Sequence, residues 1–204
     1  MQIKEASQHP LILLLVGSVL SSLLIPGISA RSTEAQLIQE TRLKKALEVG
    51  IHNREFDSKL NGITTLMKTF HNQNVRMKFN PVELRQAQNA FRKDYTDRYL
   101  ALNETAWWWY WDIQREARLL KLTSASDDAR LDQKIKEYGD STTVSVGAIA
   151  PMWKFLSSYE YRIDDGSQVE FIKLEKAMDE AITTQYKARG TLVQDMAKIF
   201  AEVQ

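Results

Sequence analysis

The chain of 204 residues has no cysteine, and it contains only three histidines, eight glycines and four prolines. The lack of cysteine excludes disulfides, thiolate nucleophiles and cysteine-ligated zinc. The 27 basic and 26 acidic side chains leave a formal net charge of +1, so no overall electric field would gather nucleic acid. We therefore expect no nucleic-acid partner. Few glycines and prolines interrupt the chain after Arg31, and this pattern is typical of long helices.

Signatures of catalysis and of metal binding are also missing. His9, His52 and His71 are far apart, and neither an HExxH pair nor a glycine-rich phosphate loop nor a GxSxG turn occurs. The stretch Asp164-Asp165-Gly166 lacks the alternating oxygen ligands of a calcium loop and predicts a turn. We therefore expect no catalytic residue, no cofactor and no metal ion, and we expect that the protein is not an enzyme.

One long apolar segment stands out near the amino terminus. Leu11 to Ile25 carries no charge, and the uncharged stretch continues to Ala30, which makes 20 residues. A helix of about 20 residues spans the roughly 30 Å hydrocarbon core of a membrane. Residues 1–30 are therefore predicted to form a membrane anchor, and residues 31–204 are predicted to form the folded domain.

Two further patterns favour a retained anchor over a cleaved segment. Basic residues follow the segment, whereas Lys4 before it is offset by Glu5, and this asymmetry predicts a single-pass inner-membrane protein with a cytoplasmic carboxyl-terminal domain. Small residues also cluster on one side of the helix, where they would allow close packing between transmembrane helices. These candidate helix-packing residues are Gly17, Ser18, Ser21 and Ser22.

The alternative interpretation is a signal peptide. Lys4 would form the basic region, Leu11 to Ile25 the apolar region, Pro26 the helix breaker, and Ile28-Ser29-Ala30 a loose cleavage site. Cleavage after Ala30 would release a periplasmic protein.

Beyond residue 31 the apolar positions repeat with the helical period. Phe56, Leu60, Ile63, Met67 and Phe70 form a heptad-like seam, which Leu43 and Leu47 precede. The register slips between Leu47 and Phe56, and this slip predicts a bend or a stutter near Gly50 and Asn53.

The segment Asn80-Pro81-Val82-Glu83 is a strong signal for a helix start. Asn80 is the expected N-cap, Pro81 the first helical residue, and Glu83 the partner in a capping box. The helix is expected to run to about Lys121. Because the link before it is short, the two long helices should form an antiparallel hairpin.

The remainder also indicates helices. A polar loop is expected at 123–126, then a short helix over 127–138 that Gly139 ends. Residues 140–161 fit either a buried helix or a short strand, with Pro151 marking a helix start. Ser167 and Glu170 predict a capping box for a final helix. The expected fold class is all-α, with a transmembrane helix followed by a long antiparallel hairpin and further helices that form a bundle.

The segment Trp107-Trp108-Trp109-Tyr110-Trp111 is the most unusual cluster. At 100° per residue, these rings point around the whole helix and cannot share one face. A stacking platform for single-stranded nucleic acid would need interleaved basic residues. The favoured interpretation is core plus subunit interface, which indicates a homo-oligomer or a protein partner. The candidate interface residues are Trp107, Trp108, Trp109 and Trp111.

Basic residues would meet near the membrane-proximal end of the hairpin. They are Arg42, Lys44, Lys45, Arg115, Arg118 and Lys121. Anionic lipid or RNA phosphate could bind such a patch. The more ordinary interpretation is a helix carboxyl terminus balanced by cations.

His9-Pro10-Leu11, Gly17, Ser18, Leu24-Ile25-Pro26 and the segment 107–118 resemble parts of a loose group of small bacterial single-pass membrane proteins. That group has a helical cytoplasmic domain and includes CRISPR-linked accessory proteins that form pores and carry a domain similar to the HEPN ribonuclease fold. The ribonuclease motif of that fold needs an arginine five positions before a histidine, and neither His52 nor His71 has one. The resemblance implies a non-catalytic, oligomeric membrane effector, pore-forming or defence-associated. The alternative is an exported helical binding or adaptor protein.

Overall fold

This computed structural model describes the backbone of residues 10–119 and 125–201. It describes their side chains except at 10–35, 38, 42, 43, 45, 46, 108–110, 113, 114, 116–119, 125–128, 200 and 201. The elements are α2 (Pro10–Met77), α3 (Pro81–Leu119), α4 (Ala125–Ala148), α5 (Ala150–Ser157) and α6 (Asp165–Ala201). The described part contains no strand, so the all-α prediction is confirmed and the alternative of a strand within 140–161 is wrong.

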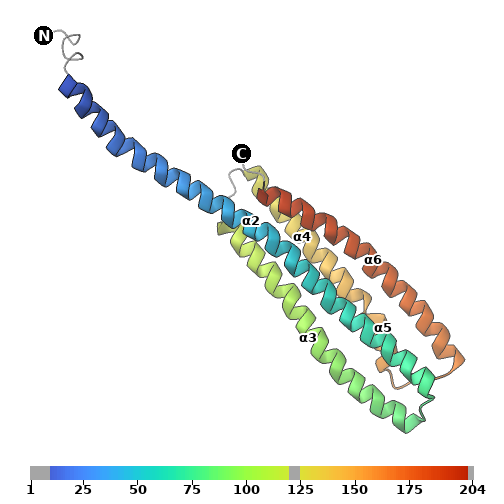
Figure 1. Cartoon of the computed structure of the whole chain (residues 1–204). Helices are drawn as coiled ribbons and strands as arrows, with labels where there is room; N and C mark the ends of the chain where they lie inside the picture. The colour runs from blue at the N-terminus through green and yellow to red at the C-terminus, as the bar shows by residue number, and fades with distance from the viewer. Residues whose placement is uncertain (1–9, 120–124, 202–204) are drawn as a thin grey trace. The chain divides into compact units, whose positions relative to one another are not determined.

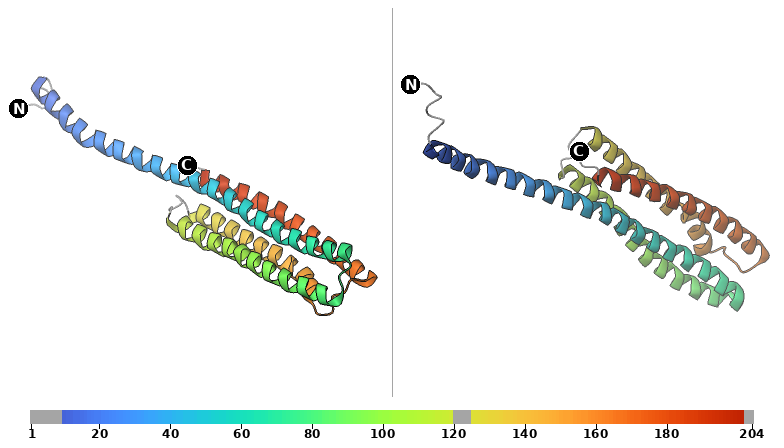
Figure 2. Two further views of the ribbon diagram at one scale, coloured as in Figure 1. Left: turned by 60° about the horizontal axis from the view of Figure 1, so that its bottom comes forward. Right: turned by 45° about the horizontal axis from the view of Figure 1, so that its top comes forward.

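The chain divides into two compact units, residues 1–44 and 45–204. The second unit is a bundle in which the carboxyl-terminal part of α2 lies beside α3, with α4 and α6 alongside (Figures 1 and 2). The short helix α5 joins α4 to α6 at the end of the bundle where α2 turns into α3. Successive long helices run in opposite directions, as in an up-down four-helix bundle.

The hairpin of α2 and α3 forms as its capping residues predict. The side chain of Asn80 accepts hydrogen bonds from the backbone N–H groups of Val82 (2.9 Å) and Glu83 (3.0 Å), and Glu83 accepts one from the Asn80 N–H (2.9 Å). Lys78 ends α2 in the left-handed conformation, with φ 49°. Arg98 on α3 donates to the carbonyl of Gly62 on α2 (3.3 Å), a contact across the antiparallel pair.

The predicted seam on α2 forms the core of the bundle. Phe56, Leu60, Ile63, Met67 and Phe70 are all buried. They pack in one cluster with residues of the other helices: Leu84, Phe91, Tyr95 and Leu102 from α3, Ile149, Met152, Leu156 and Tyr161 from around α5, and Phe171 and Met178 from α6. Burial of this apolar surface supplies the main stabilisation of the fold.

The seam extends further toward the amino terminus than predicted. Val49 and Asn53 occupy the next two seam positions and are buried, whereas Leu47 is exposed. The spacing of four and three residues is therefore unbroken, and α2 continues through Gly50. The slip inferred from the sequence was wrong because a polar residue, Asn53, occupies an inward-facing position.

Two helix boundaries also differ from the prediction. Gly139 lies inside α4, which runs on to Ala148, so the expected end at Gly139 is wrong. The N-cap of α6 is Asp164, whose carboxylate accepts a hydrogen bond from the Ser167 N–H (2.7 Å), so the capping box of Ser167 and Glu170 does not form. This bond lowers the pKa of Asp164. Pro151 lies in the first turn of α5, as predicted.

Candidate functional site

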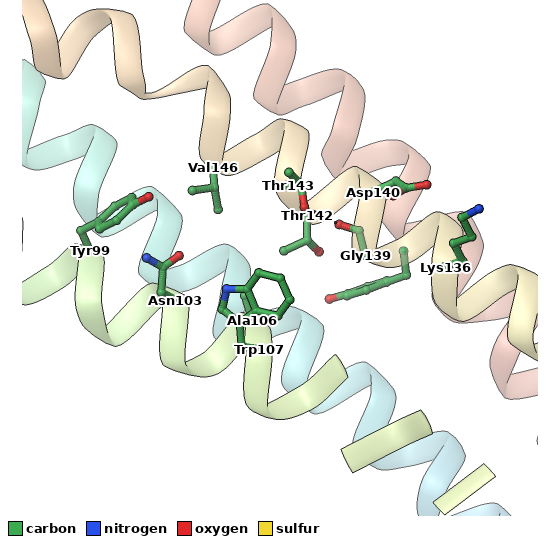
Figure 3. Close-up of a pocket in the computed structure, with 11 residues that line it drawn as sticks. Tyr99, Asn103, Ala106, Trp107, Lys136, Gly139, Asp140, Thr142, Thr143 and Val146 are labelled. Carbon is green, nitrogen blue, oxygen red and sulfur yellow. Dashed lines mark hydrogen bonds between the residues drawn. The ribbon is translucent and has the colours of Figure 1, made fainter. Parts of the chain in front are cut away.

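A groove lies between α3 and α4 within the bundle unit. Its volume is about 510 Å³. In Figure 3 the side chains from the two helices face one another across it. The lining residues are Tyr99, Asn103, Ala106 and Trp107 from α3, and Lys136, Tyr138, Gly139, Asp140, Thr142, Thr143 and Val146 from α4.

Aromatic rings make up much of the groove wall. Trp107 is 58% exposed, although it has partners within the fold, and its ring projects from α3 toward α4 (Figure 3). Tyr99 is half-buried and stacks on Tyr95, with ring centroids 5.7 Å apart. Tyr95 in turn stacks on Trp153 at 3.8 Å. The wall at Tyr99 is therefore held in place by an aromatic column that continues into the core.

The polar groups of the groove are few. Thr142 is buried, and its Oγ1 makes no hydrogen bond of good geometry among the described residues, although this hydroxyl acts on the Tyr138 side chain and opposes the rise in the pKa of Tyr138. Asn103 is half-buried and presents an amide. Lys136 and Asp140 are exposed and give the groove one charge of each sign. Thr143 donates to the Gly139 carbonyl of its own helix (3.0 Å).

Behind the groove lies a buried polar network that ties α2, α4 and α6 together. The Tyr138 hydroxyl donates to Asn53 Oδ1 (3.0 Å), and the Asn53 amide donates to Asp57 (3.1 Å). Asp57 forms an ion pair with Arg189, which also donates to the hydroxyl of Ser145. Arg189 is fully buried, with its guanidinium over the ring of Phe56 at 4.8 Å.

The electrostatics of this network follow from burial. Burial raises the pKa of Asp57, although Arg189 and the amide of Asn53 oppose the rise. Burial likewise raises the pKa of Tyr138. Nε of Arg189 is buried and has no hydrogen-bond partner among the described residues. The cost of removing these groups from water is therefore only partly compensated.

A second buried polar cluster surrounds His71 at the other end of the bundle. Nδ1 of His71 lies 2.8 Å from the Tyr161 hydroxyl, and Nε2 lies 2.8 Å from Gln168 Oε1. The imidazole stacks on Phe171, with ring centroids 3.7 Å apart. Burial lowers the pKa of His71, while Gln168 and Glu175 oppose this. Both ring nitrogens are occupied, so His71 has a structural role.

The structure describes only part of the predicted tryptophan cluster. Trp107 and Trp111 are exposed, while the side chains of Trp108 and Trp109 lie outside the described residues. Leu100 (55% exposed), Trp107 (58%) and Trp111 (63%) are spaced by seven and four residues, so they share one face of α3. We call these three residues the α3 stripe.

The predicted basic patch is described at two positions. Lys44 is exposed and belongs to the first unit. Arg115 belongs to the second unit and pairs with Asp112 on its own helix (2.8 Å). The side chains of Arg42, Lys45, Arg118 and Lys121 lie outside the described residues, as do those of Gly17, Ser18, Ser21 and Ser22. The patch and the helix-packing face therefore stay predictions.

In the part of the chain whose side chains are described, no helix is long and apolar enough to cross a membrane. The segment Leu11 to Ile25 is helical in backbone but lies outside that part. The described residues also contain no group of three or more His, Asp or Glu side chains placed to hold a metal ion.

Comparison with known proteins gives no match to a family model, a curated protein or a solved structure. The class that the fold itself defines is an up-down helical bundle with a groove between two of its helices.

Sequence reasoning missed the groove and the buried network. Arg189 falls in the gap of the apolar pattern between Tyr186 and Val193, and Asn53 falls in the apparent slip on α2. Two gaps at inward-facing positions are the signal that could have indicated buried polar partners. Gly139 could have been noticed as a glycine within a helical pattern rather than at its end.

Proposed function

We propose that this protein is a membrane-anchored helical bundle that self-associates and acts by binding, without catalysis. The observation that carries self-association is the α3 stripe, because two tryptophans and a leucine on one helix face leave a large apolar surface in water. Such patches mark interaction sites, and tryptophan is enriched at the energetic centres of interfaces. The anchor rests on the uncharged run from Leu11 to Ala30.

The finer part of the proposal follows from the resemblance to small bacterial membrane proteins. The assembled protein would be a pore-forming or defence-associated effector of the inner membrane, with the bundle in the cytoplasm. The small residues near Gly17 and Ser21 would pack the anchors together.

The first test concerns the anchor. We expect the native protein to fractionate with membranes and to have an intact mass that includes residues 1–30. The measurement is mass spectrometry of protein extracted from cells without denaturation. Mature protein that begins at Arg31 would contradict the anchor and establish the second candidate, an exported periplasmic binding or adaptor protein. That candidate is favoured by Pro26 and the Ile28-Ser29-Ala30 sequence.

The second test concerns the α3 stripe. Leu100→Ala with Trp111→Ala should lower the self-association constant at least about tenfold, because interface tryptophans commonly contribute about 2 kcal/mol or more. Neither residue lines the groove. The measurement is sedimentation equilibrium of the full chain in mild detergent.

The matched control changes an aliphatic and an aromatic residue of similar exposure on α6. Ile172 is 54% exposed and Tyr186 is 56% exposed. Ile172→Ala with Tyr186→Ala should leave self-association unchanged. A wild-type chain that stays monomeric at micromolar concentration, or equal effects of the two double variants, would contradict an interface at the α3 stripe.

A further inference from the structure

We propose that the groove between α3 and α4 binds a small, planar, uncharged heteroaromatic molecule of nucleobase size, stacked on Trp107 and hydrogen-bonded at its edge by Asn103 and Thr142. This inference is independent of membrane anchoring, and Trp107 belongs both to the groove and to the α3 stripe. It stands on the volume of the groove, its rings, its polar groups and its charge balance.

The volume of the groove fits a small molecule. Sites for small ligands usually measure about 300–1,000 Å³ and combine apolar walls with a few polar groups. The groove, at about 510 Å³, lies inside this range.

The rings of the groove favour a flat ligand. Trp107 stands at the open side with its ring directed toward α4 (Figure 3). Tyr99 is held by its stack on Tyr95, so this ring needs no rearrangement when a ligand enters. Indole and phenol faces stack on heteroaromatic rings with little dependence on their exact identity.

The polar groups favour a ligand that has both a donor and an acceptor on its edge. The amide of Asn103 offers both in one plane, which matches the edge of a nucleobase. The hydroxyl of Thr142 is buried and makes no hydrogen bond of good geometry among the described residues, with only the Tyr138 side chain acting on it, and a poorly paired buried hydroxyl is costly. A ligand heteroatom in the groove would satisfy it.

The charges of the groove favour a ligand without net charge. Lys136 and Asp140 contribute one positive and one negative side chain, and the lining contains no other charged residue. An anionic phosphate would meet Asp140 as well as Lys136, so a base or nucleoside fits better than a nucleotide.

Gly139 gives a position at which the groove can be tested by substitution. It lies in the interior of α4 and lines the groove, so a larger side chain here is expected to narrow it.

The experiment is isothermal titration of the full chain in mild detergent with adenosine, guanosine and uridine. We expect saturable one-to-one binding of at least one of them, with a dissociation constant on the order of 0.1–1 mM, typical of ligands of this size. The corresponding 5′-monophosphate should bind more weakly. Absence of saturable binding for all three nucleosides at about 5 mM would overturn the proposal. Tighter binding of the monophosphate would overturn the preference for an uncharged ligand.

Substitutions test whether the ligand binds in the groove. Gly139→Leu should weaken binding at least about tenfold, whereas Gly190→Leu, at a helix position with no heavy atom within 4 Å of an added Cβ, should leave it unchanged. Thr142→Val keeps the side-chain shape and removes the poorly paired hydroxyl, so it should keep the fold and bind several-fold more weakly. Wild-type affinity in Thr142→Val would overturn the edge contact. Wild-type affinity in Gly139→Leu would overturn the site.

Discussion

Asp57→Asn should lower the free energy of unfolding by about 3–5 kcal/mol, the cost typical of removing one partner from a buried ion pair. Arg189 is fully buried and pairs with Asp57, whose side chain is only 15% exposed. No other acid pairs with Arg189 among the described residues. The substitution would therefore leave a buried guanidinium charge without a counter-charge.

The double variant Asp57→Leu with Arg189→Met distinguishes the effect of an unpaired buried charge on stability from the effect of altered packing. Replacing both partners with apolar groups of similar size is often neutral or stabilising, so this variant should be more stable than Asp57→Asn. The Tyr138–Asn53 hydrogen bond remains available in it. The free energy of unfolding is measured by urea denaturation of the full chain, followed by circular dichroism at 222 nm.

A matched control exists on the same two helices. Lys68 on α2 pairs with Asp179 on α6 at 2.7 Å, but these side chains are 30% and 47% exposed. Asp179→Asn should therefore cost less than about 1 kcal/mol. If Asp57→Asn costs no more than Asp179→Asn, then Arg189 is not held in the buried environment that the structure shows.

His71 should make the fold less stable as the pH falls below about 6.5, the ordinary pKa of histidine. The folded chain holds the ring neutral, with Nε2–H donating to Gln168 and Nδ1 accepting from Tyr161. Burial lowers the pKa of His71 in the folded state, against the opposing effect of Glu175. A proton on Nδ1 would also remove the acceptor for the Tyr161 hydroxyl.

The direction of this pH dependence follows from the protons that the folded and unfolded chains bind. The unfolded chain takes up its proton on this histidine near pH 6.5, whereas the folded chain does so only at a lower pH. The contribution of His71 is therefore complete above pH 6.5 and is lost as the pH falls through the folded pKa. Folding raises the pKa of Asp57, so the folded chain takes up a proton on this carboxyl at a higher pH than the unfolded chain does. The contribution of Asp57 to the free energy of unfolding therefore increases as the pH falls, opposite to that of His71. The measurement is the free energy of unfolding between pH 7.5 and about pH 5.

Variants of the histidines give the size of the effect and its control. His71→Ala should cost about 2–4 kcal/mol at pH 7.5, because it loses the stack on Phe171 and leaves Tyr161 and Gln168 without a partner. Glutamine does not titrate, so His71→Gln should flatten the slope of the free energy of unfolding against pH between about pH 7.5 and pH 5. His52→Gln removes a partly exposed histidine on the same helix and should keep the slope. An unchanged slope in His71→Gln would show that another group causes the pH dependence.

Local patterns predicted the elements of this fold because local chemistry decides them. The heptad of Phe56 to Phe70 predicted the buried face of α2, and the Asn80 capping box predicted the start of α3. The short link between these helices predicted the antiparallel hairpin. Each of these features depends on residues within a few positions of one another, so the sequence carries the whole signal.

Where prediction failed, a distant residue determined the outcome. Asn53 interrupts the apolar pattern of α2, but Tyr138 and Asp57 satisfy its amide, so the seam continues. Glycine is a common helix terminator, but α4 continues through Gly139 because the neighbouring Tyr138 packs in one cluster with residues of α6 and Ser141 donates to the Gln185 carbonyl of α6. From the sequence alone, Arg189 would be expected at the surface. In the structure it is buried because Asp57 and Ser145, which are distant in the sequence, pair with it.

The sequence by itself determined the helical class, the hairpin, the main core seam and the uncharged run near the amino terminus. Periodicity and capping encode these features directly. Only the tertiary structure decided that Arg189 is buried, that Trp107 and Trp111 stay exposed, and that α3 and α4 leave a groove. These features depend on which helix faces lie opposite one another, and residues separated by about 35 to 130 positions set that arrangement through packing.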